Sequence, residues 1–381
     1  MDLAQANHAP KPYLKGRSAL DWLAALLLSA GGLFALAQYG QYMDDYEQAI
    51  LLAAIPTFIA LAWAWAGLRN LLAGVALLSL GGIELYHADL ARAEQAFLLK
   101  YFLSSQTAIG WMCFLFFFAT ATYWLGLLAR SDFAEKTGTV LTWAATVMGT
   151  TGLLVRWYES YLIGPDIGHI PISNLYEVFV LFSLITALLY LHYERHYATR
   201  RLGAFVLIVI SAAVAFTLWY TFSRGAHEIQ PLVPALQSYW MKIHVPANFI
   251  GYGAFALAAM IGVAWLLAER GILATRLPSL VMMEDVMYKA IAIGFAFFTI
   301  ATILGALWAA EAWGTYWQWD PKETWALIVW LNYAAWLHLR LTKGLRGAVL
   351  AWWAVVGLLV TTFAFLGVNM FLSGLHSYGA L

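Results

Sequence analysis

The sequence is poor in cysteine and in charge. It contains a single cysteine, Cys113, so an intrachain disulfide and a cysteine metal cluster are both excluded. Charged residues make up 11% of the chain, less than half the share of about 25% that is usual for soluble domains. Nucleophile-elbow and zincin motifs are also missing, which excludes an ordinary hydrolase. Basic and acidic residues balance at 21 each, so nothing predicts a nucleic-acid partner.

Apolar residues are what the chain has in abundance, at 62% of 381 residues. Uninterrupted apolar runs of roughly 18 or more residues recur, and this is the length that a helix needs to cross a bilayer. The sequence therefore predicts an all-α fold, a polytopic integral membrane helix bundle of about eleven transmembrane helices. The polar beginning lacks the layout of a cleavable signal peptide and is expected to stay on the chain. The expected spans are residues 22–39, 49–68, 70–86, 107–129, 139–157, 174–193, 202–222, 246–268, 286–308, 324–341 and 348–372.

Lysine and arginine in the connecting segments predict the orientation, because cytoplasmic loops carry an excess of them. A cytoplasmic N-terminus gives the inner connections fourteen of these residues and the outer connections six. The second and third spans are joined only by the short stretch "LRN" in this arrangement. Four longer segments then lie on the outer face: 87–106, 158–173, 223–245 and 309–323.

The loop "EAWGTYWQWDPKETW", residues 311–325, is the most unusual of these outer segments. Asp320, Pro321 and Glu323 fit the N-cap, the first position and the capping-box partner of a helix start. Asn174 and Glu177 predict a second capping box, before the sixth span. Capping explains the charges and the proline, but not the four tryptophans, whose flat faces suit a planar apolar ligand with polar edges. These tryptophans are Trp313, Trp317, Trp319 and Trp325.

Three histidines are candidates for ligand binding. His244 and His376 stand at matching depths on the outer face, although a single interfacial histidine often belongs only to the aromatic belt of a membrane protein. His338 lies inside the tenth span, where an ionisable side chain is costly and indicates function. It is about 20 Å deeper than the start of that helix, at 1.5 Å per residue. The sequence therefore indicates two sites, one deep and one on the outer face.

Haem meets the demands of the outer site. It is planar and apolar across its ring, it carries two carboxylates, and its iron takes imidazole as an axial ligand. His244 and His376 would approach the iron from opposite faces as neutral imidazoles. A flat quinone would also use aromatic rings and a histidine, so the residues alone leave both ligands open.

The tryptophan loop carries a resemblance to a known family. "WGTYWQWDPKETW" is similar to the tryptophan-rich WWD signature of haem-handling membrane proteins. Within that group the chain resembles the CcsA/ResC-type subunit of system II cytochrome c biogenesis, called CcsB in some bacteria. The resemblance covers roughly residues 105–381, and residues 1–104 form an N-terminal extension with about three further spans. Supporting stretches are "RWYESYLIGPDIGHIPISNLYEVFVLF", "QSYWMKIHVPANFIGYG" and "GVNMFLSGLHSY".

The resemblance implies an activity and a set of ligands. Haem b would reach the outer face of a bacterial inner membrane and be joined to the Cys-x-x-Cys-His motif of apocytochrome c, by a holocytochrome c synthase formed with a ResB-type partner. His244 and His376 would be the axial ligands of the outer haem. His338 would ligate an inner haem, whose second ligand comes from the partner. By charge alone, possible contacts to the haem propionates are Arg156, Lys242 and Lys322. The loop residues expected to bind haem are Trp313, Trp317, Trp319, Asp320 and Trp325.

Three other functions fit parts of the sequence. A haem exporter or chaperone resembling CcmC would deliver haem without forming thioether bonds, but the length of the chain and His338 argue against it. A quinone-linked redox subunit would need histidine pairs that face each other across adjacent spans, and His338 has no evident mate. A transporter of another solute would need interrupted midplane helices with polar residues, and no convincing pair is present.

Overall fold

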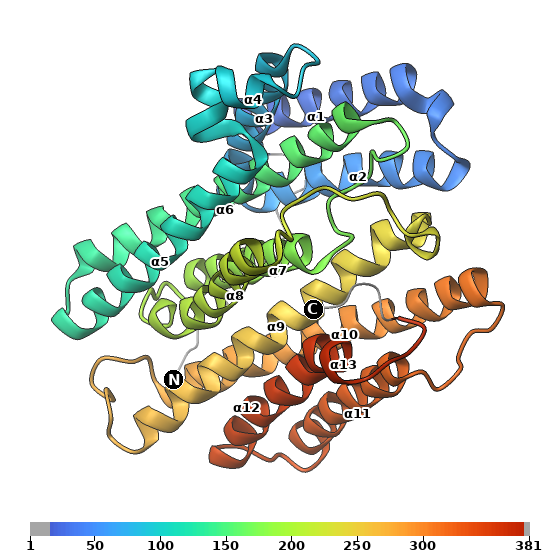
Figure 1. Ribbon diagram of the computed structural model, residues 1–381. Coiled ribbons are helices and arrows are strands. Elements are labelled where there is room, and N and C mark those ends of the chain that lie inside the picture. The colour runs from blue at the N-terminus through green and yellow to red at the C-terminus, as the bar shows by residue number, and fades with distance from the viewer. Residues whose placement is uncertain (1–15, 377–381) are drawn as a thin grey trace. The chain divides into compact units, whose positions relative to one another are not determined.

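The computed structural model describes residues 16–376, and within that range every regular element is helical (Figure 1). The chain separates into two compact units, Met1–Leu77 and Leu78–Leu381. This boundary reflects packing. The division expected at residue 104 rests on family resemblance, and it stays a prediction.

The first unit contains α1 (Ala19–Tyr39), α2 (Asp45–Ala64) and the beginning of α3 (Ala66–Tyr86). The Asp21 carboxylate closes a capping box with Ser18 at the start of α1 and also pairs with Arg69 at 2.6 Å. Helix α2 ends at Ala64 and α3 begins at Ala66, so only Trp65 separates them, and "LRN" lies inside α3. The expected connection at 68–70 is therefore wrong: a single residue in the β conformation at Trp65 suffices to end one helix and begin the next.

The second unit is a bundle built around α9 (Tyr239–Glu269), which is drawn in yellow in Figure 1. Helices α7 and α8 pack on α9, and so do α10 and α12. Helices α5 and α6 pack on each other, and α5 also contacts α8. The other elements of this unit are α4 (Arg92–Gln95), the π-helical turn η2 (Leu99–Leu103), α5 (Ser105–Ala129), α6 (Asp132–Ile163), α7 (Leu175–His196), α8 (Gly203–Arg224), the 3-10 turn η3 (Pro234–Leu236), α10 (Leu280–Trp313), α11 (Pro321–Thr342), α12 (Ala348–Thr362), the π-helical turn η4 (Phe363–Gly367) and α13 (Val368–Phe371).

Ten helical segments of the described chain are long and apolar enough to cross a membrane, counting Ala348–Phe371 as one segment. They correspond to ten of the eleven expected spans, so this is a multi-pass membrane protein. The remaining expected span, the tenth at 324–341, lies in α11, whose 22 residues would extend about 33 Å. Helix α11 is less apolar than the other ten because Asn332, His338 and Arg340 lie in it.

Two contacts fix α11 against the bundle and so set the position of the loop that precedes it. The rings of Tyr333 in α11 and Phe255 in α9 stack with their centroids 3.6 Å apart. The buried Trp336 indole donates a hydrogen bond to the backbone oxygen of Leu350 in α12, at 3.0 Å. Burial of such large aromatic side chains contributes heavily to core stability.

Candidate functional site

The tryptophan loop is held between two well-defined helix ends. Helix α10 ends at Gly314, whose φ of +79° is a left-handed conformation that favours glycine. The expected start of α11 is confirmed: Asp320 is the N-cap, Pro321 follows, and Glu323 completes the capping box. Trp319 has a φ of +59°, which is uncommon for a bulky residue and places strain at the tip of the loop.

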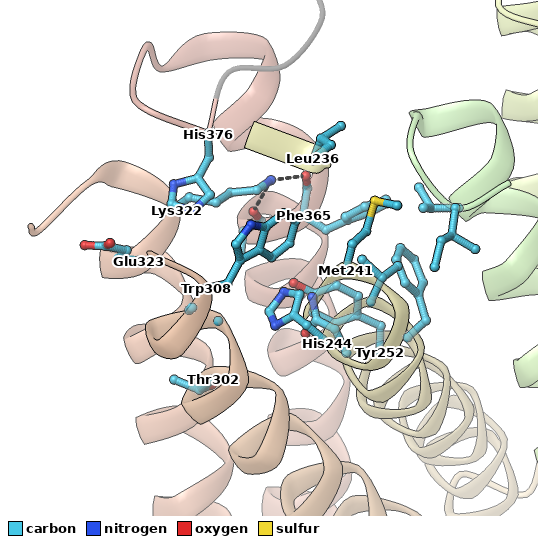
Figure 2. Close-up of a pocket in the computed structure, with 18 of the residues that line it drawn as sticks. Leu236, Met241, His244, Tyr252, Thr302, Trp308, Lys322, Glu323, Phe365 and His376 are labelled. Carbon is cyan, nitrogen blue, oxygen red and sulfur yellow. Dashed lines mark hydrogen bonds between the residues drawn. The ribbon is translucent and has the colours of Figure 1, made fainter. Parts of the chain in front are cut away.

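A cavity of about 240 Å³ lies beside this loop (Figure 2). Its lining comes from the start of α7, from α9, α10 and α11, from the tryptophan loop, and from the last helical segments and the residues after them. It is mainly apolar and aromatic, with a few polar groups. The lining includes His244, Trp308, Trp313, Trp317, Lys322 and His376.

His244 lies in the second turn of α9, on one wall of the cavity. Its Nδ1 lies 2.8 Å from the backbone oxygen of Ala301 in α10. Because a carbonyl oxygen only accepts hydrogen bonds, Nδ1 carries the proton and the lone pair lies on Nε2. Trp308 packs edge-on against the imidazole at 5.6 Å between centroids. Gly305 leaves room for the ring, since a Cβ there would lie 2.9 Å from His244 Cε1.

His376 also lines the cavity and lies five residues beyond the end of α13. In Figure 2 it is near the top of the view, well above His244. Its Nδ1 lies 2.9 Å from Asp320 Oδ2, while Asp320 Oδ1 accepts the backbone N–H of Leu375 at 2.7 Å. The carboxylate is buried, with 4% of its side chain exposed, against 27% for His376. Trp313 packs edge-on against the imidazole at 4.6 Å between centroids. As in His244, the hydrogen-bond acceptor at Nδ1 directs the lone pair to Nε2.

The four loop tryptophans have different surroundings. Trp313 and Trp317 line the cavity. Trp317 Nε1 is buried and has no hydrogen-bond partner within the described part of the chain, which leaves a donor for a ligand. Trp319 is 68% exposed and meets Trp317 edge-on at 5.9 Å between centroids. Trp325 packs on Phe363 of the π-helical turn at 4.4 Å and is not among the lining residues.

Three basic residues were expected near haem propionates, and the structure brings only Lys322 to the cavity. Its ammonium group donates to three oxygens of the last helical segments, at 2.7–3.2 Å. Lys322 precedes the span expected at 324–341, and burial lowers the pKa of its ammonium group to about 8, partly opposed by Asp320. Lys242 lies on α9 but does not belong to the lining.

Arg156 is 1% exposed and binds elsewhere. It pairs with the Glu177 carboxylate at 2.8 Å and donates to the backbone oxygens of His227 and Glu228. Asn174 caps α7 as expected, but the reciprocal half of that capping box is not formed. The Glu177 carboxylate instead accepts from Ser173 and Arg156, because the buried guanidinium is the stronger partner.

His338 is separate from the cavity. It lies 17 residues after Pro321 on α11, about 26 Å along the helix, and its side chain is exposed on the surface of this chain. The structure therefore brings His244 and His376 to one site and leaves His338 at another position.

Several lining residues were not predicted from the sequence. Trp308, Tyr252 and Phe365 belong to long apolar runs, where nothing distinguishes them from core residues. Asn369 is different, because it is a polar residue in the last apolar run, seven positions before His376. A polar amide within an apolar span is a sequence feature from which this lining residue could have been predicted.

The cavity lies within the region that comparison with known proteins singles out. The family described as Cytochrome C assembly protein matches residues 172–376, which include His244, the tryptophan loop and His376. The chain belongs to this family. The Cytochrome c biogenesis protein CcsA of Chlorella vulgaris is 36% identical over 307 residues, which cover 71% of this chain and 95% of that protein. CcsA of Parasynechococcus marenigrum is 36% identical over 274 residues, covering 64% and 87%.

The family is thus the CcsA type of cytochrome c assembly protein, as the WWD-like loop indicated. Among solved structures, Cytochrome c Heme Lyase CcmF has a similar fold, with a TM-score of 0.54 at 19% identity. The similarity covers 70% of this chain and 48% of CcmF, so it concerns the arrangement of helices and not the details of the site. Cytochrome c assembly is the role that the family assigns to this CcsA-type chain.

Proposed function

We propose that this chain holds haem b between His244 and His376 and presents it to apocytochrome c for covalent attachment. The observation that carries this proposal is that both imidazoles line one cavity and each has a hydrogen-bond acceptor at Nδ1. Each Nδ1 has a fixed acceptor, Ala301 O or Asp320 Oδ2, and each side chain lines the same cavity. The Nε2 lone pairs are then the natural ligands for iron.

The remaining cavity groups suit the same ligand. Trp313 and Trp317 offer flat apolar surfaces, and the unpartnered Trp317 N–H is a donor for a polar edge. Within the described residues, no group of three or more His, Cys, Asp or Glu side chains could hold a metal ion by itself. Two imidazoles alone match an iron whose other four ligands come from a porphyrin.

The size of the cavity makes a further demand. Its volume of about 240 Å³ is below the roughly 300–1,000 Å³ of sites that hold drug-sized ligands. A macrocycle therefore requires the tryptophan loop between Gly314 and Trp319 to move outward, while Asp320 stays in place as the cap of α11. The strained backbone at Trp319 and the short, exposed loop support this movement.

Attachment would proceed by addition. Each cysteine thiol of the Cys-x-x-Cys-His segment adds across one vinyl group: a C–S bond forms, the thiol hydrogen goes to the other vinyl carbon, and nothing is lost. The chain contributes chiefly by positioning, which makes this step effectively intramolecular. The histidine of the apocytochrome would replace one of the two imidazole ligands of this chain. This ligase activity is proposed for the chain together with its partner.

The position of His338 supports a second haem site. Its side chain is exposed on α11, so a ligand from another membrane protein, of the ResB type, would complete the coordination. We place the cavity on the outer face of a bacterial inner membrane and His338 toward the cytoplasm, as the lysine and arginine distribution predicts. Haem would then pass from the His338 side to the cavity.

Absorption spectra test the proposal. The chain is purified with its ResB-type partner as wild type and as His244→Gly, His376→Gly and His338→Gly variants. We expect a reduced low-spin spectrum in wild type, conversion to high spin in the first two variants, and its return on addition of imidazole. His338→Gly should lose a separate pool of haem. A wild-type complex without haem, or three variants with the wild-type spectrum, would contradict the proposal.

A further inference from the structure

The last apolar segment, Ala348–Phe371, is not a continuous α-helix. Helix α12 ends at Thr362, and the π-helical turn η4 follows over Phe363–Gly367 before α13 resumes the α-helix. A π-helical turn bonds residue i to residue i+5, which changes the pairing of backbone carbonyls, and such turns often mark functional sites. In this turn two of the carbonyls bind a side chain from another helix.

That side chain is Lys322, from the first turn of α11. Its Nζ donates to the backbone oxygens of Ala364 at 3.2 Å and Phe365 at 2.7 Å, and to Asn369 Oδ1 at 2.7 Å (Figure 2). An ammonium group has three N–H donors, so these three acceptors satisfy it completely. We call Lys322, Ala364, Phe365 and Asn369 the Lys322 cluster. A haem propionate would have to break one of its bonds to reach Lys322.

The Asp320 carboxylate, two residues before Lys322, holds His376. The Lys322 N–H donates to Asp320 Oδ2 at 3.0 Å, and the same oxygen accepts from His376 Nδ1. Residues 320–322 therefore hold the end of the chain at two places: the Lys322 cluster fixes residues 364–369, and Asp320 fixes Leu375 and His376. Only the six residues 370–375 separate Asn369 from His376.

From this double attachment we infer that Lys322 is a positioning residue for His376. By binding the π-helical turn, Lys322 fixes the start of the segment 370–375. That segment leads to His376 and so sets the position of its imidazole at the cavity. This inference rests on the proposed function insofar as His376 is a ligand of haem iron. It assigns Lys322 a role different from that of a charge that attracts propionates.

Conservative variants separate the two roles. Lys322→Arg keeps the charge, but a planar guanidinium does not match three convergent acceptors. Asn369→Leu keeps Lys322 and removes one acceptor, while Asn369→Asp keeps an acceptor. Positioning predicts that Lys322→Arg and Asn369→Leu behave like Lys322→Met and that Asn369→Asp behaves like wild type. Attraction of propionates by charge predicts the reverse for Lys322→Arg.

The first readout needs no haem. Hydrogen–deuterium exchange is measured on the chain with its partner after haem removal, with the exposed Lys343→Met as control. We expect amides of residues 366–376 to exchange at least tenfold faster in Lys322→Met, Lys322→Arg and Asn369→Leu, and at the wild-type rate in Lys343→Met and Asn369→Asp. Wild-type exchange in Lys322→Arg and Asn369→Leu would overturn the inference. If Lys322→Met does not fold, these two variants carry the test.

The second readout is the spin state of bound haem. The same three variants should show a larger high-spin fraction that added imidazole converts to low spin, as expected when only the His376 ligand is displaced. Low-spin spectra equal to wild type in all three would overturn the role of Lys322 in placing the ligand. A wild-type protein without haem would contradict the proposed function instead, while the exchange experiment would still decide whether Lys322 holds residues 366–376.

Discussion

Asp320 accepts the Nδ1 hydrogen bond of His376 at 2.9 Å while its other oxygen binds the backbone N–H of Leu375 at 2.7 Å. The same carboxylate caps α11. One buried side chain therefore links the start of α11 to the end of the described chain and orients an imidazole at the cavity. Partners of this kind, behind a metal ligand, fix the ring and raise its basicity.

Asp320→Asn should weaken this link without removing the ligand. Loss of such a partner costs roughly 10–100-fold in metal affinity. We also expect a higher midpoint potential, because a less basic imidazole stabilises ferric iron less. Haem titration and redox potentiometry check both effects, with the exposed Asp166→Asn as control. Wild-type affinity together with an unchanged potential would show that the hydrogen bond has no role in ligation.

Gly305→Ala should displace the other imidazole. A Cβ at this position would lie 2.9 Å from His244 Cε1 and 3.2 Å from Nδ1, so the ring has to shift and its bond to Ala301 weakens. The expected result is a high-spin spectrum with normal folding, because alanine is a better helix former than glycine. Gly110→Ala is the matched control, since its Cβ would meet nothing within 4 Å. A low-spin spectrum in Gly305→Ala would count against His244 as a ligand.

Two loop tryptophans should differ in their effect on haem binding. Trp317→Phe removes a buried N–H from a residue that lines the cavity, and we expect haem affinity to fall on the order of tenfold, as for one hydrogen bond. Trp319→Phe changes a side chain that is 68% exposed and should leave affinity within about twofold, because surface substitutions have small effects. Haem titrations of both variants make the comparison. Equal losses would mean that the loop rearranges more on binding than we propose.

Arg156→Met should lower stability. Breaking a buried ion pair by removing one partner costs about 3–5 kcal/mol, because the Glu177 carboxylate is left without its cation. Replacing both residues, with Arg156→Met and Glu177→Leu, should recover part of this loss. Thermal unfolding of the detergent-solubilised complex measures the effect. Haem bound per folded protein should stay unchanged; a specific loss of haem would instead support the propionate contact expected from charge.

The helical membrane bundle could be predicted from the sequence because crossing a bilayer requires long apolar runs, and these are local features. The start of α11 was predicted for a similar reason, since a capping box is written in four consecutive residues. The break at Trp65 was not, because neither Trp65 nor the residues on either side of it, Ala64 and Ala66, are proline or glycine. The helices also extend beyond the expected spans. Helix α10 covers Leu280–Trp313, whereas the expected span was 286–308, because a helix can continue on protein contacts after its apolar run ends.

Side-chain partners were harder to predict than helices. Charge suggested that Arg156 and Lys322 share one role, yet Arg156 pairs with Glu177 and Lys322 binds the π-helical turn. A charge in a sequence indicates that a partner is needed but not which one, since the partner lies 21 residues away in one case and more than 40 in the other. Only the packing of helices selects among the available partners.

Composition and motifs were enough to predict a multi-pass membrane protein with a tryptophan loop and three candidate histidines, because both are properties of the chain before it folds. The packing of the helices places His244 and His376 at one cavity and His338 elsewhere. It also decided that Asp320, which reads as a simple helix cap, binds His376 across 56 residues. The reason is physical: hydrogen bonds act over about 3 Å, and only folding brings such distant residues within that range.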